Sequence, residues 1–134
     1  MSDEAVRRRG IEIRLQAVPV VRIKLPDEHE PTRESAPRTV VGYRRGLSAE
    51  ELWDRGRQDW KLKAQRTLDR DLALIAHKGM IRMVGTVEGV RKTAAGRLTI
   101  EGTPLPEHHL IGHPDPLDNE AGNPLTYGSV TLPR

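Results

Sequence analysis

The sequence predicts an α+β protein: a small curled β-sheet or pseudo-barrel with one main helix packed against it. Between residues 72 and 101, short apolar runs alternate with turn-forming residues, which is typical of consecutive β-strands. Upstream, Ser48 and Glu51 form the S-x-x-E pattern of a helix start. Gly85 and Gly89 fall on one face of the middle run, which indicates a bulge or bend that curls the sheet.

Before the helix, the chain is predicted to form a strand-containing arm and a flexible linker. Residues 1–9 are highly charged and are expected to be disordered. Apolar and polar residues alternate from Ile11, and this period of two indicates a strand. Pro19 is expected to divide it into an edge strand and a second short strand over residues 20–25. Residues 26–38 are rich in Pro, Glu and Asp, which favours a linker.

The main helix is predicted to begin after its cap, Ser48, and to carry both tryptophans. Leu52, Trp53, Gly56 and Trp60 recur at spacings of three to four, which places them on one helix face. Glycine costs about 1 kcal/mol against alanine inside a helix. Gly56 therefore indicates either close packing between the tryptophans or a break in the helix.

Strands are predicted at residues 72–76, 80–90, 97–101 and 125–132. The first is a continuous apolar run, which is typical of a strand buried on both faces. Residues 77–79 and the basic stretch 91–96 provide turns between the first three strands. The last strand carries Tyr127 and would close the sheet. The composition thus divides the chain into an arm and linker (1–40) and a barrel-like domain (41–134) with a proline-rich segment from residue 102.

Length and composition exclude several classes of protein. A chain of 134 residues has room for one core. It contains no cysteine, which excludes disulfides, thiolate metal sites and cysteine nucleophiles. The charged N-terminus does not resemble a secretory signal, and no window approaches the roughly 18 apolar residues that span a bilayer. We therefore expect an intracellular, cytoplasmic protein that has no membrane partner.

Positive charge is concentrated in the middle of the chain. Residues 41–100 contain thirteen basic and seven acidic side chains, a net charge of +6, whereas residues 101–134 contain one and five, a net charge of −4. A basic centre attracts polyanions, of which nucleic acid is the commonest. The alternative is a solvated surface on which the charges cluster by chance.

Candidate nucleic-acid contacts are the central aromatic and basic residues: Trp53, Arg57, Trp60, Lys61, Arg82, Arg91, Lys92 and Arg97. Tryptophans beside guanidinium and ammonium groups suit stacking on bases with contact to their phosphates. The basic turn at residues 91–97 can follow a phosphate backbone. The alternative is that the tryptophans anchor a core without phenylalanine and that the turn is only solvated.

The sequence contains no diagnostic catalytic motif. His108, His109 and His113 lie close together, but neighbouring prolines disfavour the helix that would align them on a metal. The acidic residues near the helix alternate with basic residues at spacings that suit ion pairs. We therefore assign no catalytic residue, metal or cofactor, and expect that the protein is not an enzyme.

Part of the chain resembles a known superfamily. The stretches that carry the resemblance are Glu51–Asp54, Trp60–Leu62 and Leu72–Glu88. They are similar to the small PUA-like barrels, which include the EVE, ASCH and YTH domains. The resemblance implies binding of nucleic acid, often with one base, sometimes modified, in an aromatic-lined pocket between helix and barrel. It implies Trp53 and Trp60 as pocket aromatics, and Lys61 and Arg82 as phosphate or base contacts.

Three hypotheses for the function follow. The leading one is a non-enzymatic nucleic-acid-binding module, for DNA or RNA, with a basic surface and a tryptophan-lined base pocket. The second is a structural subunit of a larger assembly, in which residues 1–40 or 102–134 become ordered on a protein partner. The third is a small metal-dependent nuclease or hydrolase that uses the acidic residues or the late histidines.

Overall fold

The computed structural model describes residues 4–8, 11–30, 40–58, 60–93, 96–118 and 123–133. Their helices and strands, in chain order, are β1 (Glu4–Arg8), β2 (Ile11–Lys24), α1 (Ala49–Arg57), α2 (Ala64–Leu68), β3 (Leu72–His77), β4 (Met80–Thr86), β5 (Gly89–Lys92), β6 (Leu98–Glu101) and β7 (Leu125–Pro133). Residues 4–8, which belong to the predicted disordered start, form β1 instead. Residues 31–39 of the predicted linker lie outside the described residues.

Strand β2 forms the centre of a five-stranded sheet. Its residues 20–24 pair in parallel with β3, and its residues 15–23 pair antiparallel with β7. β1 pairs with the N-terminal end of β2, β4 pairs with β3, and β5 and β6 form a separate two-stranded sheet. The predicted α+β class is confirmed. The described strands do not close into a barrel, and the strand predicted within the N-terminal arm lies at the centre of the main sheet.

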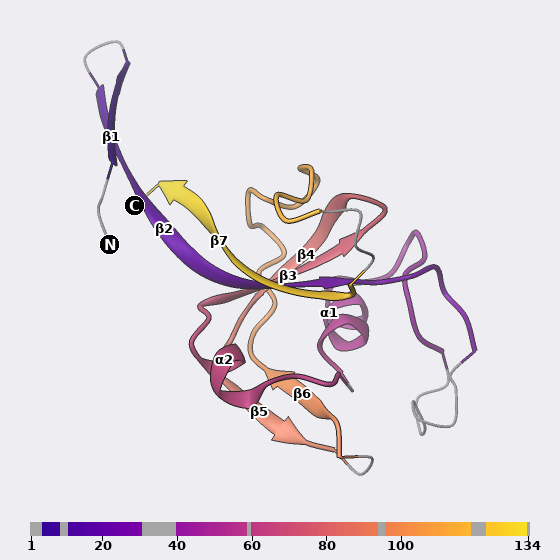
Figure 1. The fold of residues 1–134 in the computed structure, drawn as a ribbon. Helices are drawn as coiled ribbons and strands as arrows, with labels where there is room; N and C mark the ends of the chain where they lie inside the picture. The colour runs from indigo at the N-terminus through magenta and orange to yellow at the C-terminus, as the bar shows by residue number, and fades with distance from the viewer. Residues whose placement is uncertain are drawn as a thin grey trace.

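Two core clusters cover the two faces of this sheet. The first core cluster contains Val21, Ile23, Leu25, Leu52, Trp53, Ala73, Ile75, Met83 and Ile100. The second contains Val18, Val20, Leu74, Ile81, Val84, Val130 and Leu132. Figure 1 shows both helices and the β5–β6 hairpin on one side of the sheet, with residues 105–118 on the other. Successive residues of β2 and β3 alternate between the clusters because strand side chains point to opposite faces.

Pro19 lies inside β2 and does not divide it. Its carbonyl accepts the backbone N–H of Asp71 at 2.8 Å, just before β3 begins at Leu72. The N–H and C=O groups of one strand residue point toward the same neighbouring strand. The missing N–H of Pro19 therefore removes no hydrogen bond from the pairing with β7, and the predicted division of the strand at Pro19 is wrong.

Helix α1 begins as predicted but ends before Trp60. The backbone N–H of Glu51 donates to Ser48 Oγ at 3.1 Å, which confirms the predicted cap. The helix ends at Arg57, and Trp60 lies in an extended segment. The Trp60 indole N–H donates to the carbonyl of Gly56 at 2.7 Å and thereby satisfies a carbonyl at the helix end.

No helix among the described residues is long and apolar enough to cross a membrane.

The predicted strand over residues 80–90 is divided into two strands that belong to different sheets. β4 ends at Thr86 and β5 begins at Gly89. At this division the backbone N–H of Thr86 donates to the carbonyl of Thr103 at 2.9 Å. Beyond Thr86 the chain no longer pairs with β3. It continues as β5, which pairs with β6.

The sheet has its bulge at Arg82 and not at the glycines. Ile75 pairs with Met83 and Ala76 pairs with Ile81, which leaves Arg82 without a residue opposite it. A bulge shifts the alternation of side chains by one residue. Ile81 therefore belongs to the second core cluster and Met83 to the first.

Candidate nucleic-acid interface

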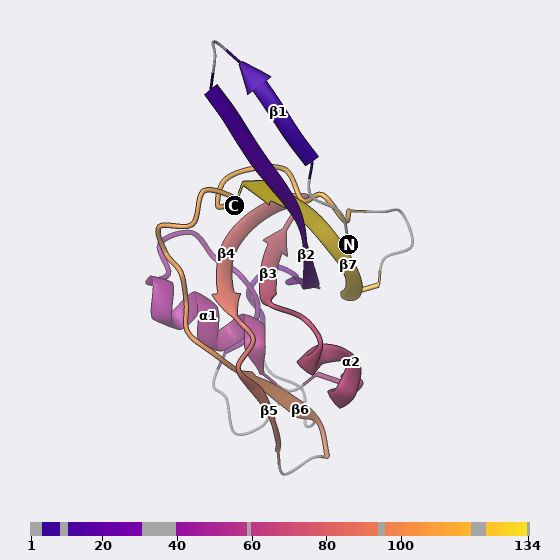
Figure 2. The same ribbon diagram turned by 90° about the vertical axis from the view of Figure 1, so that its left-hand side faces the viewer.

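The segment after α1 lies against the β5–β6 hairpin. Trp60 and Leu98 exchange two backbone hydrogen bonds, with N–O distances of 2.9 and 2.8 Å. This bridge places Lys61 and Lys63 beside a hairpin whose own strand carries Arg91 and Lys92. Two basic stretches that are separated in the sequence therefore share one end of the molecule. In Figures 1 and 2 this end lies opposite the β1–β2 ribbon.

We name this group the basic end: Trp60, Lys61, Lys63, Arg91, Lys92 and Arg97. Lys61, Lys63 and Lys92 are exposed, and none of them has an ion-pair partner within the described part of the chain. Arg91 pairs with Glu101 at 3.2 Å, where both side chains are about half exposed. Solvent screens such a pair strongly, so it does little to neutralise Arg91. The basic end thus carries several cations that can contact phosphate.

Trp60 is the aromatic residue of the basic end. It is partly exposed, and its buried part packs against the first core cluster. The hydrogen bond to Gly56 fixes the indole, and the backbone bridge to Leu98 fixes the chain around it. A fixed and partly exposed indole loses little side-chain entropy when it stacks on a base.

Arg57 has a structural role next to the basic end. Its guanidinium pairs with Asp54 at 2.6 Å and donates to the carbonyl of Ile100 at 3.2 Å. The bond to Ile100 connects α1 with β6, whereas the pair with Asp54 lies within α1. Its charge is therefore partly compensated, unlike that of the three exposed lysines.

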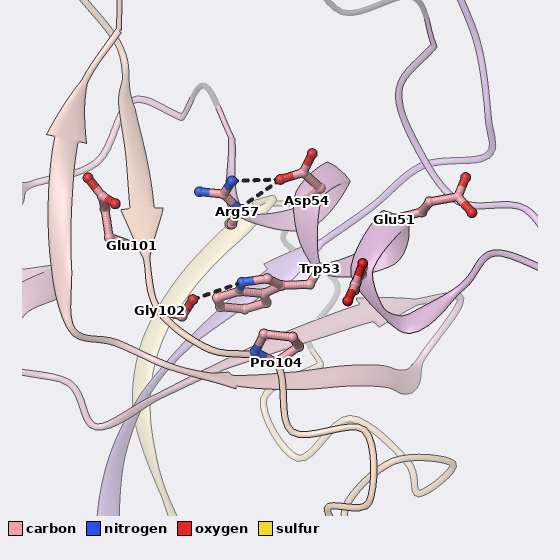
Figure 3. Close-up of a pocket in the computed structure, with 8 residues that line it drawn as sticks. Glu51, Trp53, Asp54, Arg57, Glu101, Gly102 and Pro104 are labelled. Carbon is pink, nitrogen blue, oxygen red and sulfur yellow. Dashed lines mark hydrogen bonds and ion pairs between the residues drawn. The ribbon is translucent and has the colours of Figure 1, made fainter.

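Trp53, in contrast, is a core residue. Its side chain is only 4% exposed, its ring lies against Gly85, and its indole N–H donates to the carbonyl of Gly102 at 3.3 Å. A pocket of about 610 Å³ opens beside it (Figure 3), and its charged lining residues are Glu50, Glu51, Asp54, Arg57 and Glu101. Four carboxylates against one arginine give this pocket a negative charge, which repels phosphate. The two tryptophans therefore do not face one common pocket.

Arg82 lies away from the basic end, on β4. Its guanidinium carbon is 5.2 Å from the centre of the Tyr43 ring, in a second pocket. Of the eight residues predicted from the sequence, Trp60, Lys61, Arg91, Lys92 and Arg97 lie together at the basic end.

Two residues in these places were not predicted, Lys63 and Tyr43. Lys63 follows Lys61 by two residues, a spacing that puts both side chains on one side of an extended segment. Tyr43 is one of only four aromatic residues and precedes Arg44 and Arg45. Both signals were present in the sequence.

Two of the three late histidines, His108 and His109, form a stacked pair. The ring centroids of His108 and His109 lie 4.8 Å apart. Burial, and then the nearby charge of His109, lower the pKa of His108. Within the described residues, no group of three or more His, Cys, Asp or Glu side chains is arranged to hold a metal ion.

Comparisons with known proteins identify no relative of this chain. No family model matches it, and neither does any curated protein or solved structure. The structure alone therefore defines the class of this protein: a mixed α+β protein that carries the basic end described above.

Proposed function

We propose that this protein is a non-enzymatic nucleic-acid-binding module that acts in the cytoplasm. The basic end contacts the phosphates, and the exposed part of Trp60 stacks on a base. The observation that carries the proposal is the bridge between Trp60 and Leu98, because it joins two basic stretches around one aromatic ring. The resemblance to PUA-like barrels supports the same class of ligand and stays a prediction.

A single-stranded ligand fits this surface better than a duplex. Single strands expose the faces of their bases, so that an aromatic side chain can stack on them while nearby cations follow the backbone. In a duplex the base faces are already stacked on one another, and only the base edges are open in the grooves. The basic end presents the partly exposed ring of Trp60 beside the β5–β6 hairpin, and such a ring needs an open base face.

The test is fluorescence anisotropy of the full chain with labelled single-stranded RNA, single-stranded DNA and duplex DNA of equal length. We expect the single strands to bind more tightly, with a log–log dependence on salt of about −0.7 per phosphate contacted. The salt slope counts the phosphates that the basic end neutralises. The absence of binding to all three oligonucleotides at about 50 mM salt would rule the proposal out.

A second candidate function, an interaction subunit, is favoured by the N-terminal ribbon. β1 pairs with residues 11–15 of β2, and β7 pairs with β2 only from Leu15 onward. The ribbon therefore projects beyond the body of the protein, as Figures 1 and 2 show. A projecting ribbon with a free edge suits strand addition from a partner.

Light scattering after size exclusion, over a range of concentrations, tests this second candidate. A dimer that forms whether or not nucleic acid is present would support it. A monomer at every concentration would exclude self-association through the ribbon.

A further inference from the structure

A second pocket, of about 330 Å³, lies between the start of α1 and the outer edge of β4, the edge away from β3. Residues 103–114 follow this edge and bond to it on both sides of Arg82. Leu105 N–H donates to the Val84 carbonyl at 2.7 Å, and Gly112 N–H donates to the Ile81 carbonyl at 2.8 Å. Between these two bonds, residues of β4 and of the covering segment line the pocket together.

Arg82 lines this pocket, and no described residue accepts a hydrogen bond from its guanidinium group. Its Nε is buried and has no hydrogen-bond partner, and no described residue forms an ion pair with its guanidinium. A buried donor without a partner is unfavourable, because it has lost its water without replacement. The bulge at Arg82 is what places this side chain on a sheet that is otherwise apolar here.

Aromatic rings lie beside the Arg82 guanidinium, and no carboxylate among the described residues pairs with it. Tyr43 lies 5.2 Å from the guanidinium carbon, a cation–π distance, and the His77 ring packs on Tyr43 at 4.3 Å between ring centroids. The other cation at the pocket, Arg44, is half exposed and lies 3.0 Å from Glu28, a carboxylate that also pairs with Arg55 at 2.6 Å. Of the two arginines in the described lining, Arg82 is the one that has no ion-pair partner.

The rest of the lining is apolar and includes Leu47, Leu52, Met83 and Ile111. An occupant that matches this lining combines an apolar body with a negative charge. The volume is at the lower end of the range of about 300–1,000 Å³ that is usual for ligand pockets. Such a size suits a small molecule and not a polymer.

We propose that this pocket binds a small organic monocarboxylate with an aromatic or short aliphatic body. The planar carboxylate accepts two parallel hydrogen bonds from the two terminal nitrogens of the Arg82 guanidinium, and its negative charge pairs with a cation that has no ion-pair partner among the described residues. The apolar body packs on Leu52 and Met83. This site is separate from the basic end, and the proposal does not depend on nucleic-acid binding.

The probes are benzoate and hexanoate, with benzamide, hexanamide and inorganic phosphate as comparisons. Titrations of the full chain are followed by amide chemical shifts in NMR spectra. We expect saturable binding of at least one carboxylate below about 10 mM, and binding of its amide at least about tenfold weaker. Equal binding of the amide, equal binding of phosphate, or no saturation by either carboxylate would overturn the proposal.

Two variants of Arg82 and one matched control complete the test. Arg82→Gln removes the charge, and Arg82→Lys keeps the charge but loses the paired donors of the fork. Both are expected to weaken carboxylate binding by about tenfold or more, with amide spectra otherwise like those of the parent protein. Arg45→Gln removes an exposed charge outside the pocket lining and should bind as the parent does. If Arg82→Gln does not fold, Arg82→Lys decides, and unchanged binding by that variant contradicts the proposal.

Discussion

Arg22 and Asp115 form an ion pair in which both side chains are fully buried. Arg22 Nη1 lies 2.6 Å from Asp115 Oδ2, and Arg22 Nη2 donates to Thr126 Oγ1 at 2.7 Å. The pair connects the central strand β2 with the segment that covers the second face of the sheet. It also fixes the start of β7 beside β2. Burying two charges is tolerable only because each compensates the other.

Removing one partner of this pair should be strongly destabilising. Asp115→Ala leaves the Arg22 guanidinium buried without a counter-charge, and we expect the free energy of unfolding to fall by about 3–5 kcal/mol. Urea unfolding followed by tryptophan fluorescence measures the change. Asp118→Ala is the control, because Asp118 is 4.0 Å from Arg22 and its side chain is 46% exposed. Similar losses in the two variants would contradict this account of the pair.

Gly85 is required for the packing of Trp53. A Cβ atom at position 85 would overlap the six-membered ring of the Trp53 indole, and Trp53 is buried, with only 4% of its surface exposed. We expect Gly85→Ala to lower the free energy of unfolding by about 1–3 kcal/mol, the usual effect of overpacking. Gly89→Ala is the matched control, because the nearest atom to its Cβ is 3.9 Å away. Differential scanning calorimetry should show a lower melting temperature only for the first variant.

Features of the fold that depend on local chemistry could be predicted from the sequence. The cap at Ser48 is a hydrogen bond between residues three apart. The turn at Lys78 and Gly79 is similarly local: both residues have positive φ, as the two-residue turn of a tight hairpin requires. The buried strand β3 follows from its own continuous apolar run.

Features that depend on distant partners could not be predicted. The central place of β2 depends on its parallel pairing with β3, which lies beyond both helices in the chain. The bulge at Arg82 depends on the register between β3 and β4, and no residue type marks it. Trp60 fits the helical spacing, but its indole bonds to Gly56 and its backbone bonds to Leu98. Tertiary contacts outweighed the local pattern there.

The stability of the protein should depend on Asp27 in acid. A hydrogen bond from His77, at 2.7 Å, and the charge of Lys78 hold the pKa of Asp27 below its ordinary value. The unfolded chain therefore binds this proton at a higher pH than the folded chain. The stabilisation is complete above about pH 4 and is lost as the pH falls through the lower folded pKa.

Asp27→Asn removes this dependence. The stability difference between the variant and the parent should be present at neutral pH and should disappear as the pH falls through the lowered folded pKa of Asp27. Chemical unfolding at a series of pH values measures it, with the exposed Glu107→Gln as control. A difference that stays constant across the acid range would show that the interaction is not ionic.

Charge variants should separate the basic end from the rest of the surface. Lys61→Gln and Lys92→Gln each remove one exposed cation, and each should weaken single-strand binding and reduce the salt slope by about 0.7. Arg45→Gln removes the same charge just before α1, whereas the basic end begins after that helix. Its salt slope should equal that of the parent. Equal effects of all three variants would mean that only net charge matters.

The contribution of Trp60 differs in kind from that of the lysines. Trp60→Leu keeps an apolar side chain against the first core cluster but removes the ring that stacks on a base. We expect binding to weaken by about 1–3 kcal/mol, as for other base-stacking residues, with an unchanged salt slope because no phosphate contact is lost. Anisotropy titrations at several salt concentrations, on protein shown to be folded by circular dichroism, measure both quantities. A reduced slope would mean that the substitution has displaced Lys61 or Lys63, and full affinity would remove Trp60 from the interface.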